Sequence, residues 1–343
     1  MKIGIVGYQG SGKSSLFEWL TGVKPDPATA HLGQSAMAFV PDPRIDQLCE
    51  IYHPKKITRA SLELVDTPGL SRTHEGNAAR LGMIREAGGL VLVVGAFGGG
   101  DPLVELASFD EDFLLADLEI VTGRMERIQA SFKKTLRKEE RENLEAELAA
   151  LAPLAAKLEA SQHLHAAEMT EEQLKATSSF RLLTQKPKLV VVNLADDDSP
   201  ERFVAKAPPG VPLVAVPVSL EVELARMTPE DRTDFQKEMG VGSSDRDSLL
   251  RQIMDCTGQM IYFTAGDKEV RTWLLRKGGT ALEAADNIHT DLARGFIRAE
   301  VMQCADLVRL GSEREIKAHN LLRQEPKDYV VKDGDILHIR FSV

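Results

Sequence analysis

The fold of this chain is decided by Gly7-Tyr8-Gln9-Gly10-Ser11-Gly12-Lys13-Ser14, which matches the pattern G-x-x-x-x-G-K-[ST]. An apolar run, Lys2–Val6, precedes it, and a helix-like run opens at Ser14. A strand, a glycine-rich turn and a helix in this order form a P-loop, whose backbone N–H groups face a phosphate. We expect Lys13 to reach the β- and γ-phosphates and the Ser14 hydroxyl to bind Mg²⁺. The predicted nucleotide-binding residues of this loop are Gly7, Gly10, Ser11, Gly12, Lys13, Ser14 and Ser15.

Two further segments are predicted to approach the phosphates. An alternating strand in Ser61–Leu70 ends in Asp-x-x-Gly. We expect Asp66 to hold Mg²⁺ and the Gly69 N–H to sense the γ-phosphate. The proline-broken loop Val23–Ala30 is the candidate first switch, in which Thr29 would sense Mg²⁺ or be a plain loop residue.

The residue after Gly69 governs how hydrolysis proceeds. Ras-like switches place a glutamine there to orient the attacking water, and this chain has Leu70. Hydrolysis is therefore predicted to be slow, or another group must position the water. Arg72 and His74 are the nearest candidates, and the alternative is that both are ordinary solvated residues.

Three more apolar runs, Gly89–Val94, Lys188–Asn193 and Val211–Pro217, read as buried parallel strands. Strands that alternate with helices predict an α/β fold with a doubly wound, mainly parallel sheet and the ligand at the carboxyl ends of the strands.

The end of the second of these strands carries a candidate base-reading motif. Asn193 and Asp196 keep the spacing of N-K-x-D, with Leu194 in place of the lysine. A carboxylate at this position can accept two N–H groups of guanine, which adenine does not offer. Ser219 and Leu220 would supply a short backbone loop that completes the base pocket. The alternative is that these are ordinary polar residues where the strand leads into a loop.

A helical insertion is predicted from about Leu103 to Gln185. Apolar residues recur there at steps of three and four, which indicates two helices joined through Lys133–Arg141. The two seams are Leu118, Val121, Met125, Ile128 and Phe132, then Leu144, Leu148, Leu151, Ala155 and Leu158. From Val104 to Thr184 there are 10 Lys and Arg against 16 Asp and Glu, a net charge of −6. This coiled-coil hairpin is either a rigid solvated element or an arm that docks a partner.

The last part of the chain reads as a small α+β module. Strands are expected at Val270–Leu275, Phe296–Met302 and Ile336–Phe341, and Thr280–Glu283 is a capping box that opens a helix. The pattern permits a ubiquitin-like fold, and it contains no obvious catalytic cluster.

Composition excludes several classes of protein. The net charge of −10 argues against general DNA binding. The three cysteines are far apart, which indicates reduced thiols and a cytoplasmic protein. The chain enters its first strand directly and has no apolar run of about 18 residues, so we expect neither a signal peptide nor a membrane span.

At this point the chain resembles the YchF and Obg-like ATPase family, in the Obg branch of P-loop GTPases. The resemblance covers nearly the whole length and rests on long motifs: Pro41–Leu48, Leu115–Glu119, Tyr262–Trp273, Ile288–Asp291, Gly295–Val301 and Asp328–Asp335. It implies Mg²⁺-dependent nucleotide hydrolysis, association with ribosomes and an apolar residue at the position of Leu70. It also implies a nucleotide-binding domain (1–102 and 186–258), a coiled-coil hairpin (103–185) and a β-grasp TGS domain (259–343).

The chain departs from the family pattern at four places. Gln9, Gly10 and Ser11 replace the family's Pro-Asn-Val, and the switch threonine falls at Ala30, one place after Thr29. The loop Gly95–Gly100 is short and lacks the family's histidine. Asp196 stands where the family, which prefers ATP, has a glutamate, so the choice between ATP and GTP remains open.

We therefore predict slow, Mg²⁺-dependent hydrolysis of a purine nucleotide in a conformational switch that acts on a ribosome-associated partner. The alternative is a nucleotide-binding docking protein with little or no turnover.

Overall fold

A computed structural model describes residues 1–98, 100–165, 168–196, 198–204, 207–208, 210–239 and 244–342. Contacts between residues divide the chain into two compact units. The first unit consists of Met1–Ala36 and Glu63–Ser244, and the second of Met37–Leu62 and Asp245–Val343. No helix in the described part of the chain is long and apolar enough to cross a membrane.

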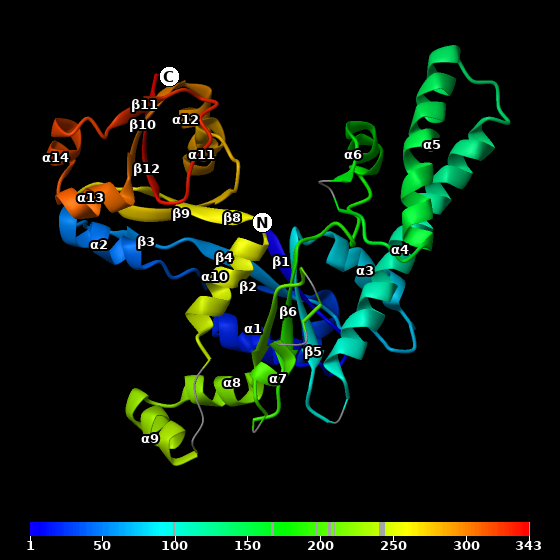
Figure 1. Ribbon diagram of the computed structural model, residues 1–343, viewed down its shortest axis with the longest axis horizontal. Coiled ribbons are helices and arrows are strands. Elements are labelled where there is room, and N and C mark those ends of the chain that lie inside the picture. The colour runs from blue at the N-terminus through cyan, green and yellow to red at the C-terminus, as the bar shows by residue number, and fades with distance from the viewer. Residues whose placement is uncertain are drawn as a thin grey trace. The chain divides into compact units, whose positions relative to one another are not determined.

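Most of a six-stranded sheet, in the order β2-β4-β1-β5-β6-β7, belongs to the first unit (Figure 1). Its strands are β1 (Lys2–Val6), β2 (Gln34–Phe39), β4 (Ser61–Asp66), β5 (Gly89–Gly95), β6 (Lys188–Asn193) and β7 (Leu213–Val216). Every pair from β4 to β7 is parallel, and the register places Ile5 beside Asp66 and Gly95 beside Asn193. The carboxyl ends of four strands, which carry the sequence motifs, therefore lie at one edge of the sheet.

The helices of this unit follow the strands as the alternating pattern predicts. They are α1 (Lys13–Thr21), the 3₁₀ helix η1 (Pro27–Leu32), α3 (Asn77–Arg85), α4 (Pro102–Ser131), α5 (Lys138–Glu159), α6 (Glu171–Thr177), α7 (Glu201–Val204), α8 (Val218–Arg226) and α9 (Pro229–Met239). Helix α1 lies between Gly12 and Gly22, which both have left-handed backbone conformations, as helix ends favour.

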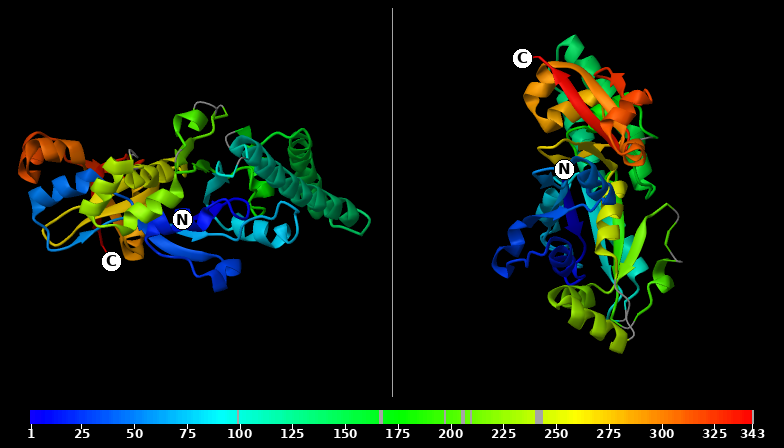
Figure 2. Two further views of the ribbon diagram at one scale, coloured as in Figure 1. Left: turned by 90° about the horizontal axis from the view of Figure 1, so that it is seen from below. Right: turned by 90° about the vertical axis from the view of Figure 1, so that its left-hand side faces the viewer.

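Helices α4 and α5 form the predicted hairpin, and Figures 1 and 2 show them side by side. All ten predicted seam residues belong to one apolar cluster along the two helices. Asp117, which is fully buried, fixes the base of the hairpin by accepting hydrogen bonds from Arg85, from the Leu183 N–H and from the Thr184 N–H and hydroxyl. Burial of an acid is tolerated here because its oxygens are satisfied by several donors.

The second unit contains a mixed sheet in the order β11-β10-β12-β8-β9-β3. Its strands are β3 (Ile57–Thr58), β8 (Gln259–Thr264), β9 (Val270–Arg276), β10 (Phe296–Gln303), β11 (Arg323–Glu325) and β12 (Asp335–Phe341). Its helices are α2 (Pro43–Tyr52), α10 (Arg246–Cys256), α11 (Ala281–Ile288), α12 (Thr290–Arg294), α13 (Cys304–Leu310) and α14 (Glu313–Ala318). The capping box predicted at Thr280 and Glu283 begins α11, with both reciprocal hydrogen bonds in place. The predicted α/β fold with a helical insertion and a separate C-terminal part is confirmed.

The segment Met37–Leu62 packs with the C-terminal residues, a pairing that motif order along the chain does not indicate. Strand β3 pairs in parallel with β9, and the Arg44 guanidinium contacts both Asp42 and Asp333 over 2.6 Å. The motif Pro41–Leu48 is therefore part of the second unit.

Candidate nucleotide site

The P-loop backbone requires glycine at several positions. Gly7, Gly10 and Gly12 have φ values of +148°, +81° and +96°. A Cβ atom at Gly7 would overlap the carbonyl oxygen of Val93, and one at Gly12 would overlap the side chain of Asn193. Any other residue at Gly7 or Gly12 would displace the loop from the sheet, so the glycines fix the cradle that the sequence predicts.

Lys13 occupies the centre of this loop. Its side chain is buried, and Nζ donates to the Tyr8 carbonyl oxygen over 2.7 Å. Burial lowers the pKa of Lys13 to about 8, while the charges of Asp66 and Glu105 act in the opposite direction. The nearby acids do not fully offset the lowering of the Lys13 pKa by burial. A desolvated ammonium group of this kind is suited to bind an anion.

Ser14 and Asp66 meet at the start of α1, and the Ser14 hydroxyl donates to Asp66 Oδ2 over 2.7 Å. Within the described residues, Asp66 Oδ1 is buried without a hydrogen-bond partner. Burial raises the pKa of Asp66, and the Ser14 hydrogen bond and Lys13 partly offset that rise. A buried carboxylate oxygen without a donor, next to a hydroxyl, is a suitable ligand set for Mg²⁺ when phosphates and waters complete the shell.

No three His, Cys, Asp or Glu side chains in the described ranges gather closely enough to bind a metal by themselves. Mg²⁺ is characteristically held by one or two protein oxygens together with substrate phosphates, and Ser14 and Asp66 offer that number of oxygens.

The segment Thr67–His74, which we call the second switch, follows β4 and contacts the P-loop through its backbone. A Cβ at Gly69 would lie 2.6 Å from Lys13 Nζ and 2.9 Å from the Gln9 nitrogen, so the chain passes directly beside the phosphate-binding groups. Leu70 forms a bridge with Tyr8, donating to the Gly7 carbonyl and accepting from the Gln9 N–H, each over 3.0 Å.

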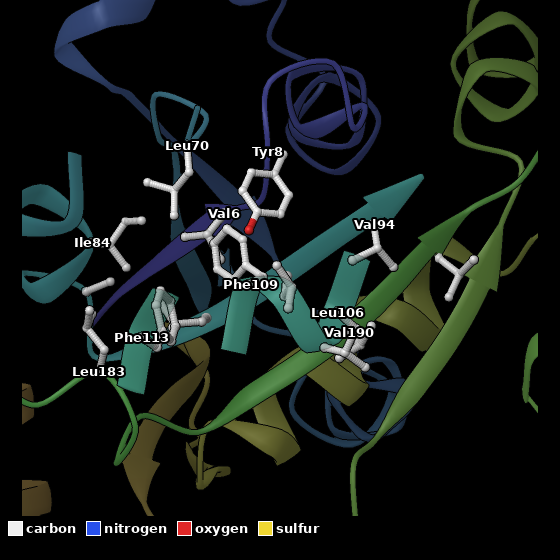
Figure 3. Packing of buried hydrophobic residues seen from close by; sticks show 14 of the residues in the cluster. Val6, Tyr8, Leu70, Ile84, Val94, Leu106, Phe109, Phe113, Leu183 and Val190 are labelled. Carbon is white, nitrogen blue, oxygen red and sulfur yellow. The ribbon is translucent and has the colours of Figure 1, made fainter. Parts of the chain in front are cut away.

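The Leu70 side chain is fully buried in the core of the first unit (Figure 3). It packs in the same cluster as Val6, Tyr8 and Phe109. Leu70 is therefore a core residue in this conformation, and it carries no group that could orient a water molecule.

Arg72 and His74, the two candidates for positioning water, each contact an acidic residue of α4. Arg72 donates to Glu105 Oε2 over 2.6 Å, and its guanidinium lies 4.9 Å from the centre of the Tyr8 ring. His74 Nδ1 lies 3.1 Å from Asp112 Oδ1. The Tyr8 hydroxyl donates to the other oxygen of Asp112 over 2.8 Å.

These side chains border a cavity of about 720 Å³. Its walls are the P-loop, the second switch, the loop after β5 and the first turns of α4. Gly99, in the middle of the short loop Gly95–Gly100, lies outside the described residues. The cavity reaches Gly10 and Ser11, so a solvent-accessible space connects the P-loop with Arg72 and His74.

On the base side, Asn193 is buried and acts as a brace. Its amide donates to the Ser11 carbonyl over 3.1 Å, and its oxygen accepts from the Val218 N–H over 3.1 Å. Asp196 lies exposed in the turn after β6. Ser219 and Leu220 lie in the first turn of α8, where we expected a loop. The helix forms because Pro217 precedes a run with apolar residues on one buried face.

The remaining predicted positions are placed as follows. Ser15 is half-buried in α1. Thr29 lies half-buried in η1, where its hydroxyl donates to the Asp26 carbonyl over 3.4 Å. A Cβ at Gly33 would lie 3.5 Å from the Asp66 carbonyl oxygen, so the segment after η1 passes close to the strand end.

Sequence reasoning missed Tyr8, Glu105 and Asp112. Tyr8 occupies a position that the P-loop pattern leaves unspecified, and the two acids lie in the predicted insertion. Their spacing of seven residues places both acids on one face of a helix, and this was the available signal.

Comparisons with known proteins identify relatives of this chain. Residues 2–118 match a family model described as "50S ribosome-binding GTPase", and residues 260–342 match the model YchF-GTPase_C, described as a protein of unknown function. The Ribosome-binding ATPase YchF of Bacillus subtilis (strain 168) is 33% identical over 366 residues, and the match covers 99% of both chains. Obg-like ATPase 1 of Oryza sativa subsp. japonica is 33% identical, over 100% of this chain and 92% of the other.

A solved structure is also similar over the whole length. The Schizosaccharomyces pombe YchF GTPase superposes with a TM-score of 0.83 at 27% identity. The match covers 99% of this chain and 97% of the other.

Proposed function

The chain belongs to the YchF and Obg-like ATPase family, and we propose that it binds a purine nucleoside triphosphate with Mg²⁺ and hydrolyses it slowly. The observation that carries this proposal is the Asp66 carboxylate beside the P-loop. One of its oxygens accepts from Ser14, and the other is buried without a hydrogen-bond partner among the described residues. Leaving a buried acceptor unsatisfied costs about 1–3 kcal/mol, and binding of a cation would remove that cost.

The roles of the residues follow from their positions. The amides of the P-loop and the Lys13 ammonium would bind the phosphates and stabilise charge in the transition state. The Ser14 hydroxyl and Asp66 would hold Mg²⁺, which when bound neutralises charge on the β- and γ-phosphates. The Gly69 N–H would sense the γ-phosphate, since this glycine lies against Lys13. Thr29 is a further candidate sensor in the first switch.

Slow turnover is proposed because the residue after Gly69 does not position water. Leu70 is buried in the core and apolar. Hydrolysis would then depend on another group or on an external partner.

For the base, we propose that Asn193 shapes the pocket and that Asp196 reads the purine, with Ser219 and Leu220 at its edge. Asn193 braces the P-loop against α8, so its main contribution is to hold these segments together. The names of the relatives include both ATPase and GTPase, and a carboxylate at Asp196 favours guanine over adenine.

The proposed partner is a ribosome or ribosomal subunit, and the proposed place of action is therefore the cytoplasm. Support comes from the names of the relatives and from the description of the family model that matches residues 2–118. In this proposal the protein is a conformational switch whose nucleotide state controls its association, through the helical hairpin and the C-terminal TGS-like part.

A second candidate function is a docking protein that binds nucleotide with little or no turnover. The engagement of Arg72 by Glu105 and of His74 by Asp112 favours it, because each side chain would have to leave its acidic partner before it could position a water molecule at the phosphates.

The test combines fluorescent ATP and GTP analogues with a phosphate-release assay in the presence of Mg²⁺. Lys13→Ala should abolish binding, whereas Lys175→Ala, at an exposed lysine in α6, should leave it intact. Tight binding by Lys13→Ala would refute the site. Release by the wild type that equals release by Asp66→Ala, with nucleotide still bound, would favour the docking protein.

Base choice and partner need separate measurements. A shift from GTP towards ATP in Asp196→Glu would assign base reading to this carboxylate. Co-sedimentation with purified ribosomes, with and without nucleotide, tests the partner.

A further inference from the structure

Arg72 starts close to the phosphate-binding groups. Gly69 lies against the Lys13 ammonium, and Arg72 follows it by three residues. Three residues span at most about 11 Å when fully extended. The Arg72 guanidinium lies over the ring of Tyr8 in the P-loop, and Arg72 borders the same cavity as Gly10 and Ser11.

Glu105 holds Arg72 in its present position and also acts on Lys13. The carboxylate accepts from Arg72 over 2.6 Å, and its charge raises the pKa of Lys13 against the effect of burial. Its other oxygen accepts from the Gly95 N–H over 3.4 Å. Glu105 therefore interacts with both Lys13 and Arg72.

We propose that Arg72 is a catalytic arginine supplied in cis for phosphoryl transfer, and that Glu105 restrains it when no nucleotide is bound. This inference rests on the proposed function and adds a residue to it. An arginine can donate two hydrogen bonds to a phosphoryl group and stabilise the charge that develops there.

The reaction itself needs no proton from Arg72. The water oxygen forms a bond to the γ-phosphorus as the bond from that phosphorus to the β–γ bridging oxygen breaks. The nucleoside diphosphate leaves with the bonding electron pair, and the proton of the water ends on phosphate or solvent. Arg72 would only donate hydrogen bonds to the transferring group.

Release of Arg72 is inexpensive. The Arg72 side chain is 59% exposed, so water can solvate the guanidinium when it leaves Glu105, whose own side chain is 11% exposed. Glu105 would keep its hydrogen bond from Gly95, and it lies in the first turn of α4, where the helix dipole favours a carboxylate. A triphosphate offers Arg72 more negative charge than Glu105 does, so nucleotide binding can draw the guanidinium away.

His74 is a weaker candidate for the same task. Asp112, which it contacts, is buried and also binds the Tyr8 hydroxyl. Withdrawing His74 would remove a partner from a carboxylate that is 7% exposed, much as withdrawing Arg72 would from one that is 11% exposed, but an imidazole lacks the two parallel N–H donors with which a guanidinium binds a phosphoryl group.

The experiment measures kcat from single-turnover phosphate release and Kd from fluorescent-nucleotide titration, with Mg²⁺ present. Arg72→Ala should lower kcat by about tenfold or more with Kd changed less than about threefold, given the large effects of such arginines. Arg72→Lys should recover only part of kcat, because lysine keeps the positive charge but lacks the two parallel N–H donors of the guanidinium. Glu105→Gln, which keeps an acceptor oxygen for Gly95, should raise kcat.

Arg80→Ala is the matched control, since this arginine follows in the same segment and contacts Glu75 O and Asn77 Oδ1 instead. Its kcat should equal that of the wild type. The inference is overturned if Arg72→Ala retains kcat within twofold, or if kcat falls equally in Arg80→Ala. Wild type that binds nucleotide but shows no Lys13-dependent turnover would overturn both this inference and the proposed hydrolysis. Normal turnover that is insensitive to Arg72 would overturn this inference alone.

Discussion

The pH dependence of nucleotide binding should report the Lys13 ammonium directly. Burial lowers the pKa of Lys13 to about 8 in the nucleotide-free protein. A bound triphosphate favours the charged form, so the pKa rises on binding and the complex takes up a proton. Affinity should therefore be nearly constant below pH 8 and should fall as the pH rises above it.

The magnitude follows from the fraction of Lys13 that is charged. With a pKa of about 8, that fraction is about three quarters at pH 7.5 and about one tenth at pH 9. Affinity should fall about eightfold between these values, which corresponds to about 1.2 kcal/mol. The nucleotide contributes little to this change because its terminal phosphate, with a pKa near about 6, is already ionised.

The assay is a titration of a fluorescent nucleotide analogue from pH 7 to 9.5 at constant ionic strength and Mg²⁺. Calorimetry at pH 8 in buffers of different ionisation enthalpy should show uptake of about half a proton. Glu105→Gln removes a charge that raises the pKa of Lys13, so the bend in the profile should move to lower pH. An affinity that stays constant from pH 7.5 to 9, or a bend that moves upward in Glu105→Gln, would refute the reasoning.

Three substitutions test other parts of the first unit. Gly12→Ala places a side chain at φ +96° and should weaken nucleotide binding at least tenfold in the same titration. Leu70→Gln buries an amide in the core and should cost about 2–4 kcal/mol in urea denaturation, without accelerating phosphate release. Asp117→Asn leaves the Arg85 guanidinium, of which 11% is exposed, without its counter-ion and should cost about 3–5 kcal/mol. Glu119→Gln, at an exposed site on the same helix, should have almost no effect on stability, and equal losses in both variants would contradict the role of Asp117.

The elements that sequence patterns located are those whose causes are local. The strand Lys2–Val6 and the cradle after it follow from an apolar run and from glycines that must adopt positive φ values. The helix after Thr280 follows from a capping box in which both hydrogen bonds lie within four residues. The seams of α4 and α5 follow from periodicity alone, since a helical face with regular apolar residues must be covered.

The features that sequence patterns did not locate depend on contacts between distant residues. Tyr8 and Asp112 are 104 positions apart, and neither carries a local sign of the other. Strand β3 has only two residues, and its partner β9 lies more than 200 positions later, so no pattern assigns Met37–Leu62 to the second unit. Ser219 was expected in a loop because it follows a strand, yet a buried apolar face after Pro217 gives a helix.

The backbone at Leu70 predicts that a glutamine at this position would not accelerate hydrolysis. The bridge to Tyr8 fixes the peptide groups on both sides of Leu70, and that geometry directs its side chain into the core. A side chain of any kind at this position would face Phe109 and its neighbours as long as the bridge holds. A group that acts on the phosphates must then come from farther along the second switch, and Arg72 is the first cation there. The burial of the Leu70 side chain and the proposed role of Arg72 are therefore linked through one backbone arrangement. Their linkage predicts that Leu70→Gln and Arg72→Ala combined should release phosphate no faster than Arg72→Ala alone.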